Sequence, residues 1–249
     1  MPHRLQLAAS NREFRANAAD FDGTNDSLER GGGLTGVVDA GTGILALWGH
    51  FNGGDTTEQI LFDTPGGTVR CIRTLVAATN FLSIVLAGGA FTTHFRTTTA
   101  INIATGWFSM LAAWDNNIVI NKIRHLYIND VSDIAFIGGS DDAFLVDYTQ
   151  TNWGVGARVG GVSRMNGCLS EVYFAPGQLL DFSITANRRK FIDAAGKPVP
   201  LGSNGSNPTG TAPAIYLNNS AAGFQFNKGT GGNFTTVGTL TNCATSPSD

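Results

Sequence analysis

Acidic side chains are the first candidates for chemistry in this sequence, and their spacing argues against a glycosidase. A retaining glycosidase needs two carboxylates about 5–5.5 Å apart, which one strand can present at alternating positions, as in Glu-x-Asp-x-x-Glu. The sequence lacks that motif, and none of its glutamates has an acidic partner at such a spacing on a recognisable strand: Glu13, Glu29, Glu58 and Glu171. We therefore expect Glu171 to be an exposed or hydrogen-bonded strand carboxylate and the protein not to be an enzyme.

Histidine and arginine side chains could serve a different enzyme, a lyase that acts on uronate polymers. Such a lyase needs a Tyr or His base and cationic neighbours that neutralise the substrate carboxylate. Strand alternation places His94 and Arg96 on one face, and Arg70 and Arg73 lie in another strand. A basic face built from these four residues is one alternative, but strand residues that face water give the same composition, and we favour that explanation. The sequence also lacks a nucleophile elbow, an HExxH zinc motif and a Walker loop.

Aromatic side chains offer another kind of chemistry, the stacking of sugar rings. Carbohydrate sites combine an aromatic face with Asn or Asp side chains that bind hydroxyl groups. Trp48 and Trp114 lie in apolar strands and are predicted to be core. Trp153 follows a polar stretch that contains Tyr148 and Asn152. We expect these last three residues to face a ligand.

The overall charge excludes two classes of partner. Lys and Arg total 16 and Asp and Glu total 19, which gives a formal net charge of −3 without a basic cluster. A nucleic-acid groove or a patch for anionic membranes has no electrostatic support in such a chain. The apolar stretch 82–91 is far shorter than the roughly 20 residues of a membrane span, and the first residues have no apolar core of a secretion signal. We expect neither nucleic acid nor a membrane as a partner.

Cysteine usage predicts no cross-linked framework. Cys71, Cys168 and Cys243 are widely spaced and odd in number, so they form neither a disulfide set nor a zinc knuckle. We expect reduced, packed thiols. A bond from Cys243, in the polar tail, to another subunit is the alternative.

Short apolar runs bounded by turn residues predict an all-β fold that positions these side chains. Glycine accounts for 32 of the 249 residues, and runs of strand character recur between Gly, Asn, Asp and Thr. Their density favours a mostly antiparallel jelly-roll sandwich. The expected strands are 20–21, 27–29, 43–51, 58–63, 69–75, 81–86, 92–98, 107–115, 123–128, 133–138, 154–159 and 167–174.

Composition divides the chain into three parts. Residues 1–19 are expected to form an N-terminal arm and residues 20–195 the sandwich. Residues 196–249 are rich in Gly, Asn and Thr, and we expect a C-terminal extension that packs on the sandwich or on a neighbouring subunit.

Local patterns add one helix and two strand-like segments near the C-terminus. A Ser or Thr cap followed by spaced apolar residues predicts a short helix over 183–193. Within the extension, only 214–217 and 224–226 have strand character.

Five landmarks occur in the order seen in one superfamily. They are an opening Phe-Asp-Gly strand, two strands with tryptophan, a Leu-Tyr hairpin and a closing Glu-Val strand: 21–28 (FDGTNDSL), 45–51 (LALWGHF), 106–115 (GWFSMLAAWD), 125–130 (HLYIND) and 165–174 (MNGCLSEVYF). Over about residues 20–195 the chain thus resembles laminin-G-like domains of the concanavalin A-like superfamily. The resemblance implies a jelly-roll sandwich with extended N- and C-terminal segments.

The resemblance also implies a calcium site, because laminin-G-like and lectin domains often bind this ion through carboxylates and carbonyl oxygens at the sandwich rim. Three loops of the sequence supply such oxygens. The candidate ligands are Asp22, Asp26, Asp115, Asp141 and Asp142. Each is also an ordinary Asx turn, which is the favoured alternative for every one of them taken singly.

The tail shows a second resemblance, to laminin-G-like proteins of tailed bacteriophages, at 196–199 (GKPV), 207–213 (NPTGTAP) and 245–249 (TSPSD). It implies a virion component assembled in the bacterial cytoplasm, with other virion proteins and further copies of itself as partners. We therefore predict a non-enzymatic virion structural protein of capsid or tail, with host surface glycan as a secondary ligand. A stand-alone carbohydrate-binding lectin and a polysaccharide-cleaving enzyme are the alternatives.

Overall fold

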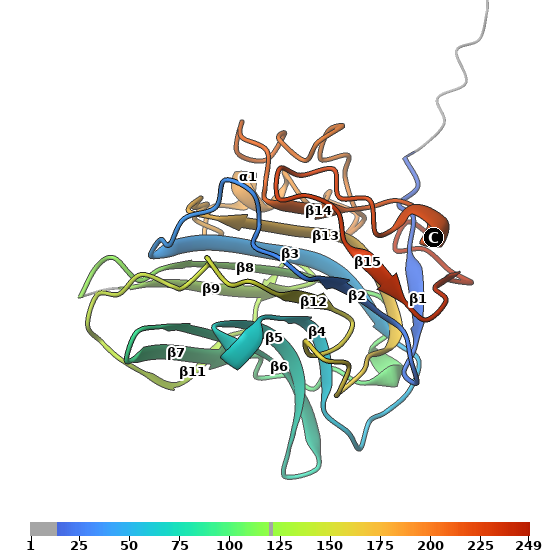
Figure 1. Cartoon of the computed structure of the whole chain (residues 1–249), viewed down its shortest axis with the longest axis horizontal. Coiled ribbons are helices and arrows are strands. Elements are labelled where there is room, and N and C mark those ends of the chain that lie inside the picture. Colours follow the sequence, from blue (N-terminus) through green and yellow to red (C-terminus); the bar gives the residue numbers. More distant parts are fainter. Residues whose placement is uncertain (1–13, 120–121) are drawn as a thin grey trace, which may run out of the picture.

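The computed structural model describes residues 14–119 and 122–249 and consists of two sheets packed face to face (Figure 1). Sheet A contains β1 (Ala19–Asp22), β3 (Thr42–Phe51), β8 (Phe108–Asp115), β9 (Ile123–Ile128), β10 (Val131–Ser132), β13 (Asn166–Pro176), β14 (Ile215–Leu217) and β16 (Thr241–Asn242). Sheet B contains β2 (Ser27–Arg30), β4 (Gln59–Asp63), β5 (Val69–Val76), β6 (Thr79–Gly88), β7 (Phe91–Arg96), β11 (Ala135–Gly139), β12 (Trp153–Val155) and β15 (Thr235–Val237).

The strand order confirms the predicted antiparallel jelly-roll sandwich. Sheet A runs β10-β9-β8-β3-β13-β1-β16, with β14 paired to β13, and sheet B runs β11-β7-β6-β5-β4-β12-β2-β15. Neighbouring strands in both sheets are antiparallel, as in β3 beside β8 and β5 beside β6. The strands therefore form two layers whose facing sides are apolar.

Strand alternation builds the main core between the two sheets. In β8, Phe108, Met110 and Trp114 are fully buried and face sheet B. The residues between them, such as Leu111 and Ala113, point to the other side of sheet A. Side chains of a strand alternate between faces, and each large apolar side chain buried in this way stabilises the fold by about 1.5–3 kcal/mol.

A second, smaller core lies on the outer face of sheet A, which the chain after β13 covers (Figure 1). Phe182, Phe191 and Leu201 pack there against Trp48 and Tyr173. The segment that supplies them contains the one α-helix of the described residues, α1 (Thr185–Arg188), which is shorter than the predicted 183–193. The helix ends early because Ile192 forms a β-bridge with Pro198 and needs extended backbone.

The 3-10 helices found in residues 14–119 and 122–249 are single turns between strands. They are η1 (Pro65–Gly67), η2 (Ile103–Thr105) and η3 (Ala221–Gly223). No helix in the described residues is long and apolar enough to cross a membrane.

Residues 196–249 contribute to both sheets. β14 pairs with β13, β15 with β2 and β16 with β1, and Ile215, Leu217, Phe224 and Phe234 belong to the main core. The strand expected at 224–226 is wrong, because Phe224 ends the η3 turn and the Phe226 N–H bonds back to Gly223.

The expectation of three reduced thiols is wrong for two of them. Cys168 in β13 and Cys243 after β16 form a disulfide within the chain, across 75 residues of sequence. The pairing of β16 with β1, which lies next to β13, brings the two Cα atoms to 6.2 Å, a distance that a disulfide can bridge. Cys71 is free and buried, as predicted.

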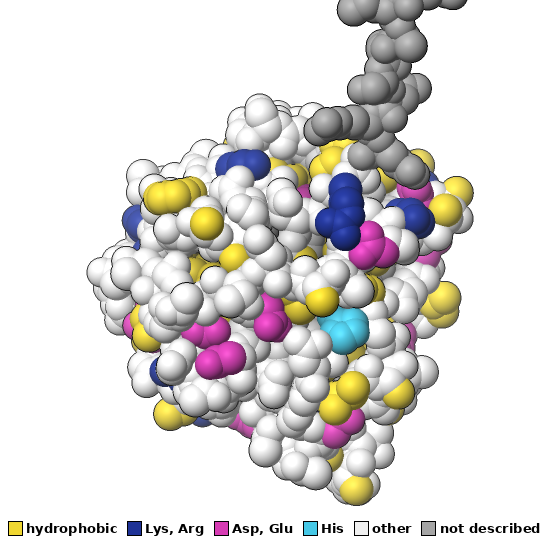
Figure 2. All heavy atoms as spheres, turned by 90° about the vertical axis from the view of Figure 1, so that its right-hand side faces the viewer, with side chains coloured by type: hydrophobic (Ala, Val, Ile, Leu, Met, Phe, Trp, Pro, Cys, Tyr) yellow, Lys and Arg dark blue, Asp and Glu magenta, His cyan; other side chains and the backbone are white. Residues whose placement is uncertain are grey.

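The surface matches the low charge of the sequence. On the face seen in Figure 2, Lys, Arg, Asp and Glu side chains are scattered among polar atoms and backbone, and small apolar groups lie between them. With a net charge of −3, this face presents no large field of one sign.

Candidate functional site

Trp153 and Tyr148 lie in the core, so the prediction that they face a ligand is wrong. Trp153 is fully buried against Phe62 and Phe174, and its indole Nε1 donates a hydrogen bond of 3.0 Å to the carbonyl of Gln150. Tyr148 is also fully buried; its hydroxyl accepts a hydrogen bond from Trp114 Nε1 and donates one to a backbone carbonyl. Asn152 beside them is half-buried. Trp153 is buried because it belongs to β12, which lies between β4 and β2 in sheet B and turns this side chain inward.

Three of the five aspartates predicted to bind calcium accept hydrogen bonds from backbone N–H groups. Asp22 Oδ1 accepts hydrogen bonds from the backbone N–H groups of residues 24, 25 and 26, and Asp115 Oδ1 accepts one from Asn117. Asp26 bonds the backbone of Asp22 and Thr239. Within the described residues, no three of the five carboxylates share one cluster of donor atoms. The calcium site stays a prediction.

A pocket of about 350 Å³ lies at one rim of the sandwich, and the sequence analysis did not predict it. Its size falls within the range of about 300–1,000 Å³ that is typical of small-molecule sites. One side is the segment that follows β7 and includes η2, and the other is the β9–β10 hairpin with the residue after it. The lining residues are Thr98, Thr99, Ala100, Ile101, Thr105, Ile128, Asn129, Val131, Ser132 and Asp133. We call it the rim pocket.

Asp133 connects the two sides of the rim pocket. Its Oδ1 accepts hydrogen bonds from the N–H and hydroxyl of Thr98, at 2.6 and 2.5 Å, and its Oδ2 accepts one from the Thr99 hydroxyl. Burial acts to raise the pKa of Asp133, but these hydrogen bonds outweigh it and leave the pKa below its ordinary value. The side chain is therefore a fixed carboxylate.

The hairpin on the other side is held in place at its turn. Asn129 and Asp130 both adopt positive φ, +50° and +68°, which forms the tight turn that joins β9 to β10. Asn129 Oδ1 accepts a hydrogen bond of 2.9 Å from the N–H of Ser109. Asp130 forms ion pairs of 2.5 and 2.7 Å with Arg188 and Arg189. Hydrogen bonds from these two guanidinium groups lower the pKa of Asp130.

The chemistry of the rim pocket suits an uncharged, hydroxyl-rich ligand. Buried Ile101 and Ile128 provide aliphatic surface, and Val131 is 66% exposed at the edge. Threonine and serine hydroxyls and the Asn129 amide supply hydrogen-bond donors and acceptors. Lys, Arg and His are absent from the described residues that line it, and Asp133 is ionised, so an anion has no partner there.

The four residues considered for a basic face do not form one. Arg73 is fully buried, lies over the Phe51 ring and pairs with Asp55 at 2.9 Å. Arg70 pairs with Asp63 at 2.6 Å. His94 and Arg96 lie on β7, where burial lowers the pKa of His94 and Arg96 covers the ring of Phe81.

Glu171 is a buried structural carboxyl. It is 4% exposed, and its Oε2 accepts a hydrogen bond from the Tyr216 hydroxyl. Burial raises the pKa of Glu171 to about 7. The adjoining cavity measures about 10 Å³, room for a single water and not for a sugar ring. The expectation of a hydrogen-bonded strand carboxylate agrees with this geometry.

By sequence, the chain matches no protein-family model and no curated protein. By structure, it is similar to a heptameric SAP-like pentraxin from Limulus polyphemus, with a TM-score of 0.51 at 12% identity over 69% of this chain and 81% of the pentraxin. A Bacteroides ovatus protein assigned to carbohydrate binding has a TM-score of 0.62 at 14% identity. That match covers 93% of this chain and 61% of the B. ovatus chain, so this chain spans less than two thirds of the longer protein.

A third similar structure is the LG4-5 region of the mouse laminin α1 chain, with a TM-score of 0.44 at 14% identity over 68% of this chain and 43% of that one. At these identities the comparisons define the fold. The chain shares the fold of the pentraxin and of the B. ovatus protein, and this fold is the jelly-roll sandwich that the landmarks in the sequence predicted.

Proposed function

We propose that this protein binds carbohydrate without cleaving it and that the rim pocket is the binding site. The observation that carries the proposal is the composition of the pocket, which places aliphatic surface beside hydroxyl groups and one fixed carboxylate in about 350 Å³. Sugars present the same combination, because C–H faces alternate with hydroxyl groups around the ring. The B. ovatus protein of similar fold, assigned to carbohydrate binding, adds support.

The negative charge in the rim pocket favours a neutral sugar over an acidic one as the ligand. Asp133 accepts hydrogen bonds from Thr98 and Thr99 and stays ionised, and the lining residues supply no cation to balance a uronate or a sialic acid. A neutral hexose or deoxyhexose avoids repulsion from this carboxylate and can donate hydroxyl hydrogens to the acceptors around the rim.

A retention assay tests the binding and the absence of cleavage together. The purified protein is passed over immobilised bacterial surface polysaccharides, both neutral and acidic, first with calcium and then with a chelator. The masses of the eluted sugars are measured by mass spectrometry. We expect retention on neutral polysaccharides and no shortened products. Retention that the chelator abolishes would support the calcium prediction, whereas shortened products would contradict the non-enzymatic assignment.

The finer proposal places this binding protein on a bacteriophage particle, assembled in the bacterial cytoplasm with other virion proteins and further copies of itself. Its support is the resemblance of the tail at 196–199, 207–213 and 245–249 to tails of phage-borne laminin-G-like proteins. Deletion of the tail is a poor test, because Ile215 and Leu217 belong to the core. Mass spectrometry of virions purified from a strain that encodes the chain should find it in the particles; its presence only in the unsedimented lysate would contradict the proposal.

A further inference from the structure

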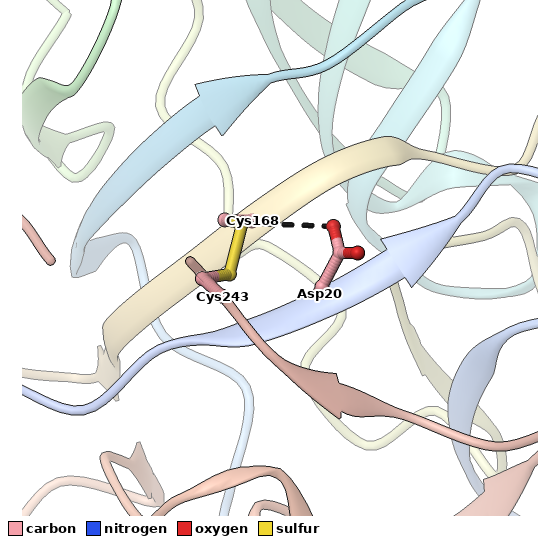
Figure 3. Close-up of side chains that lie close together, drawn as sticks. All are labelled: Asp20, Cys168 and Cys243. Atoms are coloured by element: carbon pink, nitrogen blue, oxygen red, sulfur yellow. Dashed lines mark hydrogen bonds between the residues drawn. A yellow bond between two sulfur atoms is a disulfide. The ribbon is translucent and has the colours of Figure 1, made fainter. Parts of the chain in front are cut away.

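The disulfide joins an interior strand to the end of the chain (Figure 3). Cys168 lies in β13, is 5% exposed and stands opposite Asp20 of β1. Cys243 directly follows β16, a two-residue edge strand with exposed side chains, and is itself half-buried. The two cysteines therefore differ in their exposure to solvent.

A polar pocket of about 180 Å³ opens onto Cys243. Its lining includes Arg15, Ser220, Asn242 and Thr245 beside the cysteine, and Cys168 does not contribute to it. A small thiol that enters this pocket meets Cys243, whereas Cys168 does not line the pocket.

Asp20 places a carboxylate beside the disulfide, with its oxygen and the two sulfurs all within 4.8 Å of one another. Its Oδ1 lies 3.6 Å from Cys168 Sγ, the contact marked by the dashed line in Figure 3. A disulfide sulfur carries no hydrogen, so in the oxidised protein this is a contact between a carboxylate and sulfur, and it becomes a hydrogen bond only when Cys168 is a thiol. Asp20 also accepts a hydrogen bond of 2.9 Å from Asn52, which holds it in place. This carboxylate repels a thiolate that approaches either sulfur, so the preference for Cys243 rests on the pocket.

We propose that Cys168–Cys243 is a reversible thiol-exchange site that accepts low-molecular-weight thiols at Cys243 and controls the attachment of residues 241–249. A thiolate attacks Cys243 Sγ, a mixed disulfide forms there, and the bond to Cys168 breaks. The electron pair leaves on Cys168 Sγ, which takes a proton from solvent, and the resulting thiol can donate a hydrogen bond to Asp20. A second thiol attacks the mixed disulfide, so that two thiols are oxidised to one disulfide while Cys168 and Cys243 are reduced to thiols.

The exchange would release what we call the terminal clasp, the contacts that hold residues 241–249 against Arg15 and Ala16. Ser246 is buried, and its hydroxyl donates to the Ala16 carbonyl, while the Ala16 N–H donates to Ser248. Arg15 pairs with Asp249 at 2.8 Å, but both side chains are largely exposed, and such pairs hold weakly. The disulfide is the one covalent link in this clasp, and the sandwich core does not include it.

The state of the clasp would then follow its surroundings. Thiols stay reduced in a cytoplasm that contains glutathione and thioredoxin, whereas disulfides persist outside the cell. For a protein made in the cytoplasm and released on a particle, which is the proposed location, the clasp would be open during assembly and closed afterwards. The exchange chemistry itself does not depend on that location or on sugar binding.

Reduced glutathione tests the site on the full chain under native conditions. Samples are quenched with an alkylating reagent over time, and peptides are identified by mass spectrometry. We expect glutathione on Cys243 as the intermediate, then alkylation of Cys168 and Cys243 while Cys71 stays unmodified. Hydrogen exchange should rise in 14–22 and 241–249 and stay unchanged in β3 and β8.

The variant Asp20→Asn removes the charge and keeps the hydrogen-bond acceptor for Asn52. It should speed reduction severalfold, because Cys168 becomes the better leaving group, whereas Asp141→Asn, on an exposed turn, should not. Glutathione found on Cys168, or an unchanged rate in Asp20→Asn, would overturn the assigned direction of attack. If Cys168 and Cys243 are modified only at the rate at which Cys71 is modified and the whole protein unfolds, the exchange site is overturned. The disulfide is then a permanent cross-link.

Discussion

Glu171 Oε2 accepts a hydrogen bond of 2.7 Å from the hydroxyl of Tyr216, and this pair joins β13 to β14 inside the molecule. Glu171 is 4% and Tyr216 1% exposed. Glu171 stands at an irregularity in the pairing of β13 with β3, where its φ is +49°. Strain at such a residue persists only when the surroundings hold it. The C-terminal part of the chain is thus attached to sheet A through a buried carboxyl.

The Glu171 carboxyl should make stability depend on pH near neutrality. Burial raises its pKa from 4.5 to about 7, so the folded state binds its proton more tightly than the unfolded state. The resulting stabilisation is fully present below about pH 4.5 and is lost as the pH rises through about 7. The loss should amount to about 3 kcal/mol, and Glu171→Gln should remove this dependence. Urea unfolding at about pH 5 and about pH 8 measures it.

The matched control is Glu58→Gln, because Glu58 is half-exposed and pairs with Arg158 at the surface. This variant should keep the pH dependence of the wild type. If Glu171→Gln loses stability between about pH 5 and about pH 8 as steeply as the wild type does, groups other than Glu171 cause the pH dependence.

Trp153→Ala should unfold the protein more easily and should not act on sugar binding alone. The side chain is fully buried and contacts Phe62 and Phe174. Truncation of a buried tryptophan leaves a cavity and costs about 3–5 kcal/mol. The midpoint of chemical unfolding should fall accordingly, while any protein still folded should bind sugar as before. A variant that is as stable as the wild type but no longer binds sugar would show that Trp153 belongs to the ligand site.

Ala100→Leu should weaken sugar binding and leave stability unchanged. Ala100 is exposed and lines the rim pocket, so a larger aliphatic side chain occupies the space of the ligand without entering the core. Ala90→Leu, also exposed but in the turn between β6 and β7, is the matched control. Affinity for the retained polysaccharide should drop about tenfold or more in the first variant only, which equals about 1.4 kcal/mol of binding free energy. Equal affinities would place the sugar site elsewhere.

Asp133→Asn should loosen the rim pocket and change the response to acid. The carboxylate accepts hydrogen bonds from Thr98 and Thr99, which lower its pKa against the opposite effect of burial. Its stabilisation is present above the ordinary pKa of 3.8 and is lost as the pH falls through the lower folded value. The variant should be about 1–3 kcal/mol less stable near neutral pH and less sensitive to acid. Thermal unfolding scans across the acidic range compare the two proteins.

The core strands could be predicted from local pattern. The strand at 123–128 was predicted with the bounds that it has, because a short run of strand character ends there at turn residues. The turn at Asn129-Asp130 was predicted from its residue types. The short strands β10, β15 and β16 were not, since two or three residues are too few to carry a periodic signal.

The site residues depended on contacts that local pattern does not contain. Trp153 sits in a polar stretch, yet it is core, because strands from two distant parts of the chain flank β12. The rim pocket needs Thr98 and Asp133, which are 35 residues apart and meet through a hydrogen bond. The threonine run 97–99 was the one signal of it, and such a run is also ordinary strand composition.

The amino-acid sequence by itself determined the all-β class, the antiparallel order of short strands and the weakly charged surface, because alternation and turn chemistry act between near neighbours. Only the tertiary structure decided that Cys168 meets Cys243, that Glu171 is buried against Tyr216 and that Trp153 turns inward. These outcomes follow from which strands become neighbours in the two sheets. That choice is made by the packing of the whole core, where segments far apart in the chain bury their apolar faces together.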